Sequence, residues 1–93
     1  MNRTVAIVVF PGVQALDVSG PMDVFAEANR FLASEDHYRL EVIGVERGPM
    51  PCSNGLTLSA HRHYSEASQA YDLLLVAGGP QLPFLDFGET FDA

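Results

Sequence analysis

Two short runs of almost uninterrupted apolar residues constrain the fold of this chain most strongly. Residues 4–10 are largely β-branched, and residues 71–77 form a second run; glycine and proline follow each of them directly. Strands that are apolar on both faces are typical of the centre of a parallel sheet that helices cover on both sides. The pattern therefore predicts an α/β fold with two buried central strands.

The segment between the two runs supplies the other predicted elements. Ser19-Gly20-Pro21 predicts a helix start, because Ser or Gly suits the cap and Pro suits the first turn. The helix is expected to end near Ser34, with an apolar stripe made of Val24, Phe25, Ala28, Phe31 and Leu32. The remaining predicted elements are a strand over 38–45 nearer the sheet edge, a loop over 46–54, a strand over 56–60, a short helix over 64–70 and a first helical turn over 88–92.

The length of 93 residues fits one domain at most. Two strands that are apolar on both faces need helices on both sides, and only one strong helix is predicted, so a large apolar surface would stay exposed. We therefore expect residues 1–93 to be the N-terminal portion of a larger α/β domain. The alternative is a short protein that buries these faces by forming oligomers.

The charge distribution argues against a nucleic-acid binder. The net charge is −7, the five basic residues are dispersed arginines, and neither Lys nor Arg follows Arg62. Such a chain has no basic run to neutralise phosphates. Its carboxylates are interpreted as a solvated face, with an acidic partner-docking surface as the alternative. A single Cys, no signal-type start and no run long enough for a bilayer span predict a cytoplasmic protein without membrane contact.

Two features lie where ligands bind in open α/β sheets, beyond the carboxyl ends of the strands. Asp17 follows the first strand, and Gly78-Gly79-Pro80 follows the second apolar run. A carboxyl group in partly apolar surroundings can stay protonated and donate a hydrogen bond to a thiolate or an oxyanion. Glycine N–H groups can stabilise an oxyanion. The competing interpretations are a helix-capping Asp17 and a plain strand-ending turn.

No metal ion or other cofactor is predicted. His61 and His63 would share a face of a strand, but a metal site needs a third ligand, and His37 and Cys52 qualify only if the fold brings them close. No basic residue lies between Arg47 and His61, so no neighbour in the sequence activates Cys52 as a nucleophile.

The stretch from the first strand into the helix resembles a known family. It reads Phe-Pro-Gly at 10–12, Leu-Asp at 16–17, Gly-Pro at 20–21 and Val-Phe at 24–25. This pattern resembles the opening of the ThiJ/PfpI superfamily, the class I glutamine amidotransferase-like proteins. Ser-x-Gly-Leu at 53–56 and the Gly-Gly at 78–79 fit the same family. The resemblance implies a flavodoxin-like three-layer sandwich with a mostly parallel sheet, of which this chain is the N-terminal half.

Two branches of that superfamily share the opening motif. The leading hypothesis is the ligand-sensing domain of an AraC-type transcriptional regulator, because residues 26–29 and 38–42 look more like that branch. It implies a homodimer and a small-molecule ligand, such as an amine or a quaternary ammonium compound, near Asp17, Gly78, Gly79 and Pro80. DNA would be contacted by a C-terminal helix-turn-helix domain that is absent from this chain, which would itself have no enzymatic activity.

The alternative is an isonitrile hydratase-like enzyme or an amidase. Asp17 would then be the acid–base partner of a catalytic cysteine beyond residue 93, a position that Cys52 does not occupy. Ala77 stands where many family members have Pro before the Gly-Gly. A third possibility is an inactive module that only dimerises.

Overall fold

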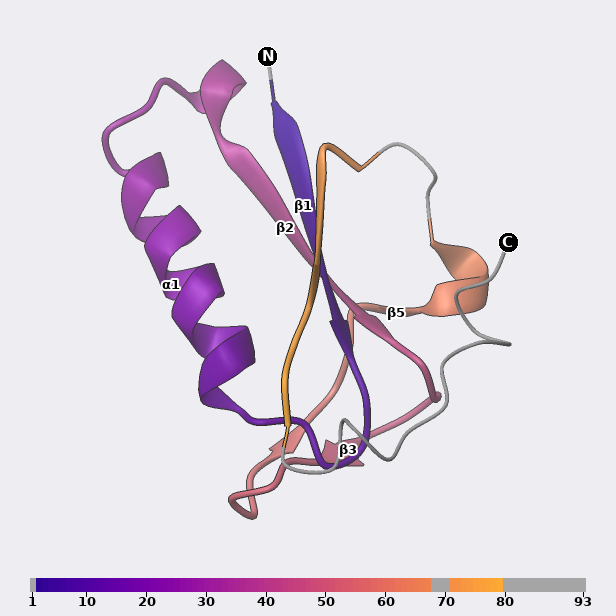
Figure 1. Cartoon of the computed structure of the whole chain (residues 1–93). Helices are drawn as coiled ribbons and strands as arrows, with labels where there is room; N and C mark the ends of the chain where they lie inside the picture. Colours follow the sequence, from indigo (N-terminus) through magenta and orange to yellow (C-terminus); the bar gives the residue numbers. More distant parts are fainter. Residues whose placement is uncertain (1, 68–70, 80–93) are drawn as a thin grey trace.

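The computed structural model describes residues 2–67 and 71–79 (Figure 1). In chain order the elements are β1 (Arg3–Val9), α1 (Leu16–Asn29), the 3₁₀ helix η1 (Ser34–Asp36), β2 (Tyr38–Gly44), β3 (Met50–Pro51), β4 (Thr57–Leu58), β5 (Arg62–His63), the 3₁₀ helix η2 (Tyr64–Glu66) and β6 (Leu73–Val76). The predictions that fall on Pro80 and on residues 88–92 lie outside the described residues. No helix in the described ranges is long and apolar enough to cross a membrane.

Four strands form one sheet in the order β5-β2-β1-β6, and each neighbouring pair is parallel. β1 lies inside this sheet, and from Val5 to Val9 no side chain is more than 2% exposed. The prediction of a buried central strand over residues 4–10 is confirmed. The parallel sheet with a covering helix also confirms the α/β fold class.

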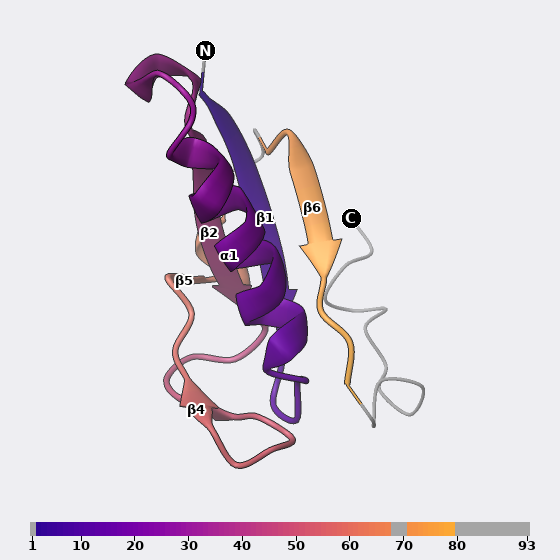
Figure 2. The same ribbon diagram turned by 90° about the vertical axis from the view of Figure 1, so that its left-hand side faces the viewer.

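The helix α1 packs against one face of the sheet, in front of β1 and β2 in Figure 2. It begins at Leu16, before the predicted Ser19-Gly20-Pro21 start, and it ends at Asn29 instead of near Ser34. Pro21 therefore lies inside the helix. Its ring has no N–H to donate to the Asp17 carbonyl four residues earlier, so the first turns lack one helical hydrogen bond.

The buried stripe of α1 also differs from the prediction. Val24 is 67% exposed and Phe31, beyond the helix end, is 81% exposed, whereas Val18 is buried and Met22 packs on the core. Because the helix begins earlier, the core-facing side starts at Val18 and continues to Met22 and Phe25 at four- and three-residue spacing.

The segment predicted as a loop over residues 46–54 contains β3, which pairs antiparallel with β4 as a small hairpin. Cys52 N–H donates to the Leu56 carbonyl at 2.6 Å, and Ser53 N–H donates to the Val13 carbonyl at 2.9 Å. The first bond closes the hairpin itself, and the second ties it to the β1–α1 connection. The strand predicted over 56–60 is thus present in shortened form, and the short helix predicted from residue 64 is the single 3₁₀ turn η2.

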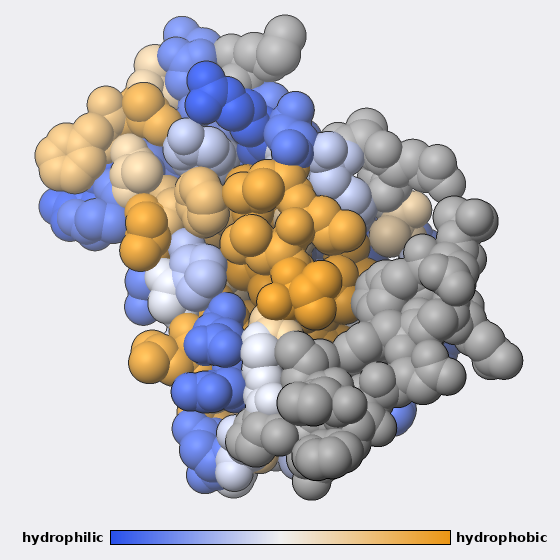
Figure 3. Space-filling model, in the orientation of Figure 1, coloured by the Kyte–Doolittle hydropathy of each residue, from blue (hydrophilic) through white to orange (hydrophobic). Residues whose placement is uncertain are grey.

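β6 forms at the predicted place, but within the described residues it is not the fully buried strand of the prediction; it carries the exposed apolar surface that the sequence predicts for a chain with only one strong helix. Leu73, Leu74 and Val76 are 43%, 54% and 51% exposed. The reason is topological: β6 pairs only with β1 among the described strands, and α1 lies over β1 and β2. Figure 3 shows the resulting apolar surface on this side of the molecule.

Candidate functional site

The strand order creates a topological switch point between β1 and β6. From β1 the chain crosses through α1 to β2 on one side, and β6 pairs with the opposite side of β1. A switch point leaves a crevice at the carboxyl ends of the two neighbouring strands, and ligands of open α/β sheets usually bind in such crevices. Asp17 and Gly78 both lie at this point.

A direct hydrogen bond joins these two predicted site residues. The Gly78 N–H donates to Asp17 Oδ2 at 3.2 Å, although the residues are 61 positions apart in sequence. The Gln14 N–H donates to the Gly78 carbonyl at 2.8 Å and closes the same junction from the other side. In this arrangement the Gly78 N–H serves Asp17 and not a ligand.

The capping interpretation of Asp17 is not what the geometry shows. Asp17 lies in the first turn of α1, whose N-terminus has no side-chain capping bond. Its exposed carboxylate reaches across to the chain after β6 instead. The sequence could not distinguish these possibilities, because both place an acidic residue near a helix start.

Both glycines lie close to other parts of the chain. A Cβ on Gly78 would lie 2.7 Å from Asp17 Oδ2, and one on Gly79 would lie 2.8 Å from the Gly12 carbonyl oxygen and 3.3 Å from the Phe10 ring. Neither glycine has a positive φ. The Gly-Gly therefore lets the chain after β6 pack directly on the β1–α1 connection.

A shallow hollow of about 270 Å³ opens beside Asp17. Its lining is mainly apolar and consists of Leu16, Asp17, Pro21, Leu75, Val76, Ala77 and Gly78. One carboxylate on an otherwise apolar wall suits a ligand with a cationic group attached to an apolar body. Pro80, the fourth predicted site residue, lies outside the described residues.

Gln14 is a site-forming residue that the sequence did not indicate. Its contribution is a backbone N–H, and nothing in its side chain or in its neighbours signals that role. Only the expectation that the two loops meet at one sheet edge pointed toward this contact.

The histidines and Cys52 have structural roles away from this hollow. His61 Nδ1 accepts a hydrogen bond from the Val42 N–H at 2.8 Å, and the buried Cys52 thiol is free. No group of three His, Cys, Asp or Glu side chains with the geometry of a metal site occurs within the described ranges.

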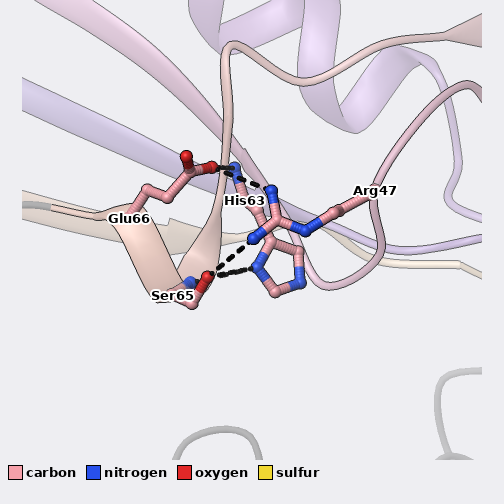
Figure 4. A network of polar contacts seen from close by, with 4 residues as sticks. All are labelled: Arg47, His63, Ser65 and Glu66. Carbon is pink, nitrogen blue, oxygen red and sulfur yellow. Dashed lines mark hydrogen bonds and ion pairs between the residues drawn. The ribbon is translucent and has the colours of Figure 1, made fainter.

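His63 belongs to a polar network with Arg47, Ser65 and Glu66, drawn in Figure 4. His63 Nδ1 contacts Ser65 Oγ at 2.7 Å, and Arg47 Nη1 donates to Glu66 Oε1 at 3.2 Å. The His63 backbone N–H, followed by Arg47, holds the pKa of the Glu66 carboxyl below its ordinary value of 4.5. The network closes the first turn of η2 and attaches it to the β2–β3 connection.

Comparison with known proteins identifies the family of this chain. The model of the DJ-1/PfpI family matches residues 3–85. The chain belongs to the DJ-1/PfpI family. A protein encoded in the cpoL 5′ region of Streptomyces lividans is 39% identical over 89 residues, which are 96% of this chain and 60% of that protein.

Solved structures show the same DJ-1/PfpI fold. An AraC family transcriptional regulator from Pseudomonas putida has a TM-score of 0.74 at 21% identity over 90% of this chain and 51% of its own. A DJ-1 superfamily protein from Salmonella typhimurium has a TM-score of 0.70 at 22% identity over 85% of this chain and 40% of its own. The chain thus spans 60% or less of the length of these relatives.

Proposed function

We propose that this DJ-1/PfpI chain is part of the ligand-sensing domain of an AraC-type transcriptional regulator. In this proposal residues 1–93 are the N-terminal portion of the domain in a cytoplasmic homodimer, and a separate domain contacts DNA. The chain contributes one wall of a pocket for a small molecule, with Asp17 and the Gly78-Gly79-Pro80 segment at its edge.

The observation that carries the proposal is the hydrogen bond between Gly78 and Asp17 beside an apolar hollow. It brings two candidate site features together at the switch point of the sheet, where ligands of this fold class bind. Asp17 remains solvent-exposed in this arrangement. An organic cation would pair with the carboxylate and place its apolar part against Leu75 and Pro21, which supports an amine or a quaternary ammonium compound as the ligand class.

The resemblance of residues 26–29 and 38–42 supports the regulator branch. These two segments contact each other in the structure: the Tyr38 N–H donates to Asn29 Oδ1 at 2.7 Å, and Asn29 Nδ2 donates to the Tyr38 carbonyl at 3.0 Å. The net charge of −7 also fits a sensing module that leaves DNA contact to another domain.

A ligand screen on the full-length protein tests this function. Small amines and quaternary ammonium compounds are ranked by their effect on the thermal midpoint of the wild type, Asp17→Asn and the control Asp23→Asn. Asn keeps an oxygen acceptor for the Gly78 N–H but removes the charge, so we expect Asp17→Asn to lose the ligand-induced shift and Asp23→Asn to keep it. Equal shifts in all three proteins would refute a site at Asp17.

The exposed Asp17 carboxylate also supports a second candidate function, an enzyme of the isonitrile hydratase or amidase type. Asp17 would then act with a cysteine located beyond residue 93. Incubating the full-length protein with an aliphatic isonitrile or a simple amide distinguishes the two. Turnover that Asp17→Asn abolishes would favour the enzyme, whereas ligand-dependent binding of operator DNA without turnover would favour the regulator.

A further inference from the structure

A second hollow, of about 520 Å³, lies at the opposite end of the sheet from Asp17. It is lined by Thr4, Arg39, Leu40, Glu41, His61, Arg62 and Tyr71. These residues come from the amino-terminal halves of β1 and β2, from the start of β5 and from the segment that precedes β6. The proposed function makes no use of them.

One backbone position on the outer edge of β2 is open to this hollow. Alternate residues of a strand direct their N–H and C=O groups to the same side, so Tyr38, Leu40 and Val42 share one edge. Both backbone groups of Val42 are bound to His61 on this edge. The Val42 N–H donates to the ring atom His61 Nδ1, and the His61 backbone N–H donates to the Val42 carbonyl, both at 2.8 Å. The Asn29 side chain covers Tyr38 in the same manner.

Leu40 lies between these two covered positions. β5 pairs with β2 only at Ile43 and Gly44, near the lower end of β2 in Figure 1. No strand of the described chain therefore runs beside Leu40 on that edge. Its N–H is a donor whose direction is fixed by the sheet, and Leu40 is one of the residues that line the hollow.

Arg39 is a cation without a protein partner at the same place. Within residues 2–67 and 71–79 its side chain forms neither an ion pair nor a hydrogen bond. The other arginines each contact an acidic or tyrosine side chain: Arg3, Arg30, Arg47 and Arg62. A guanidinium group presents several N–H donors in a planar fork that matches carboxylate and phosphate oxygens.

The carboxylates around the hollow are already satisfied by donors. Glu41 contacts Arg62 Nε at 2.5 Å and accepts from the Tyr71 hydroxyl at 2.7 Å. Asp72, adjacent to Tyr71, accepts from the Thr4 N–H at 2.8 Å. Arg62 engages Glu41 through Nε, which leaves its two terminal nitrogens as donors.

His61 adds a further donor to the same lining. The Val42 N–H points at His61 Nδ1, so the ring proton of the neutral side chain is assigned to Nε2. The hollow thus offers donors from Arg39, Leu40, His61 and Arg62, whereas its one lining carboxylate has its partners.

We propose that this hollow binds a small oxyanion, a carboxylate or phosphate group, held by the Arg39 guanidinium and the Leu40 N–H. The site is independent of the ligand at Asp17, because it lies at the amino ends of the strands and not at their carboxyl ends. The exposure of Arg39 and the neighbouring acidic residues predict weak, salt-sensitive binding.

A backbone-amide NMR titration of the full-length protein tests the proposal, with inorganic phosphate and malonate as separate probes. We expect the Leu40 amide resonance to shift with saturation, whereas the amides of Tyr38 and Val42, which already have protein acceptors, shift less. A response to phosphate alone would assign the site to phosphates, and a response to malonate alone would assign it to carboxylates.

Substitutions decide whether Arg39 holds the anion. Arg39→Ala should weaken binding at least about tenfold, Arg39→Lys should weaken it less, and the control Arg30→Ala, at the exposed residue that follows α1, should leave it unchanged. Because Arg39 is exposed, these variants are expected to fold. The proposal is overturned if neither probe shifts Leu40, or if Arg39→Ala binds as the wild type does.

Discussion

At the scale of single residues, the candidate site depends on the absence of a Cβ atom at Gly78 and Gly79. Any Cβ on Gly79 would meet the Gly12 carbonyl oxygen and the buried Phe10 ring, neither of which can move away easily. A Cβ on Gly78 would meet only the end of the Asp17 side chain, which can rotate. The two glycines therefore have different tolerances, although they are adjacent.

We expect Gly79→Ala to lower the free energy of unfolding by about 2 kcal/mol through overpacking. Gly78→Ala should cost about 1 kcal/mol, mainly through the lost hydrogen bond to Asp17. Urea unfolding measures both. Gly20→Ala is a control for an added Cβ that meets no atom within 4 Å; because Gly20 lies inside α1, this change is expected to raise stability by up to about 1 kcal/mol. A Gly79→Ala protein as stable as the control would contradict the close packing.

The Glu66 carboxylate makes the stability of the fold depend on acid pH. The folded-state pKa of Glu66 is lowered, first by the His63 N–H and then by Arg47. The ionised carboxylate therefore stabilises the fold above its ordinary pKa of 4.5, and this contribution disappears as the pH falls through the lower folded-state value. In Glu66→Gln the loss of stability between about pH 5 and about pH 3 should be smaller than in the wild type.

Urea midpoints measured across this pH range decide the matter. Glu46→Gln serves as the control, since Glu46 is exposed and forms no ion pair within the described residues. The same pH dependence in Glu66→Gln and in the wild type would show that the network in Figure 4 does not hold in solution.

At the scale of elements, α1 is attached to β2 by one amide side chain. Asn29, the last residue of α1, both donates to and accepts from the Tyr38 backbone. In this way the side chain substitutes for a neighbouring strand at the first residue of β2. It also protects part of an edge that would otherwise present unpaired backbone groups.

Removing this amide should loosen the junction. We expect Asn29→Ala to lower the free energy of unfolding by about 1–2 kcal/mol, because two partly buried hydrogen bonds are lost, and to accelerate hydrogen exchange at the Tyr38 amide. Asn54→Ala, which removes one exposed turn contact to Leu56, should have a smaller effect. Unchanged exchange at Tyr38 would argue against the pairing.

At the scale of the whole molecule, the described structure has one covered and one poorly covered region. The core between the sheet and α1 is closed, whereas β6 exposes three large apolar side chains. Burial of such a surface is favourable by roughly 25 cal/mol per Å², so it promotes association.

The 93-residue chain is therefore expected to self-associate in a concentration-dependent manner. Leu74→Lys should shift sedimentation velocity profiles toward the monomer, because it places a charge on the exposed side of β6. Leu56→Lys is the control: Leu56 is 61% exposed but lies at the β3–β4 hairpin. Equal association of both variants would show that β6 is not the associating surface.

The amino-acid sequence was sufficient to predict the class of the fold, the position of β1 and β2 and the residue types at the switch point. These properties follow from local patterns: apolar runs for strands, glycines for close approach and the motif around Asp17 for the family. Local patterns also misplaced the start of α1, because Pro21 is typical of a first turn and its tolerance inside the helix is not visible in the sequence.

The contacts between residues far apart in sequence became visible only in the folded chain. The bond from Gly78 to Asp17, the role of the Gln14 backbone and the open edge at Leu40 all depend on strand order and on the pairing of β1 with β6. The exposure of β6 has the same origin. Strand order is set by contacts between residues far apart in sequence, and periodicity within a single segment carries no information about them.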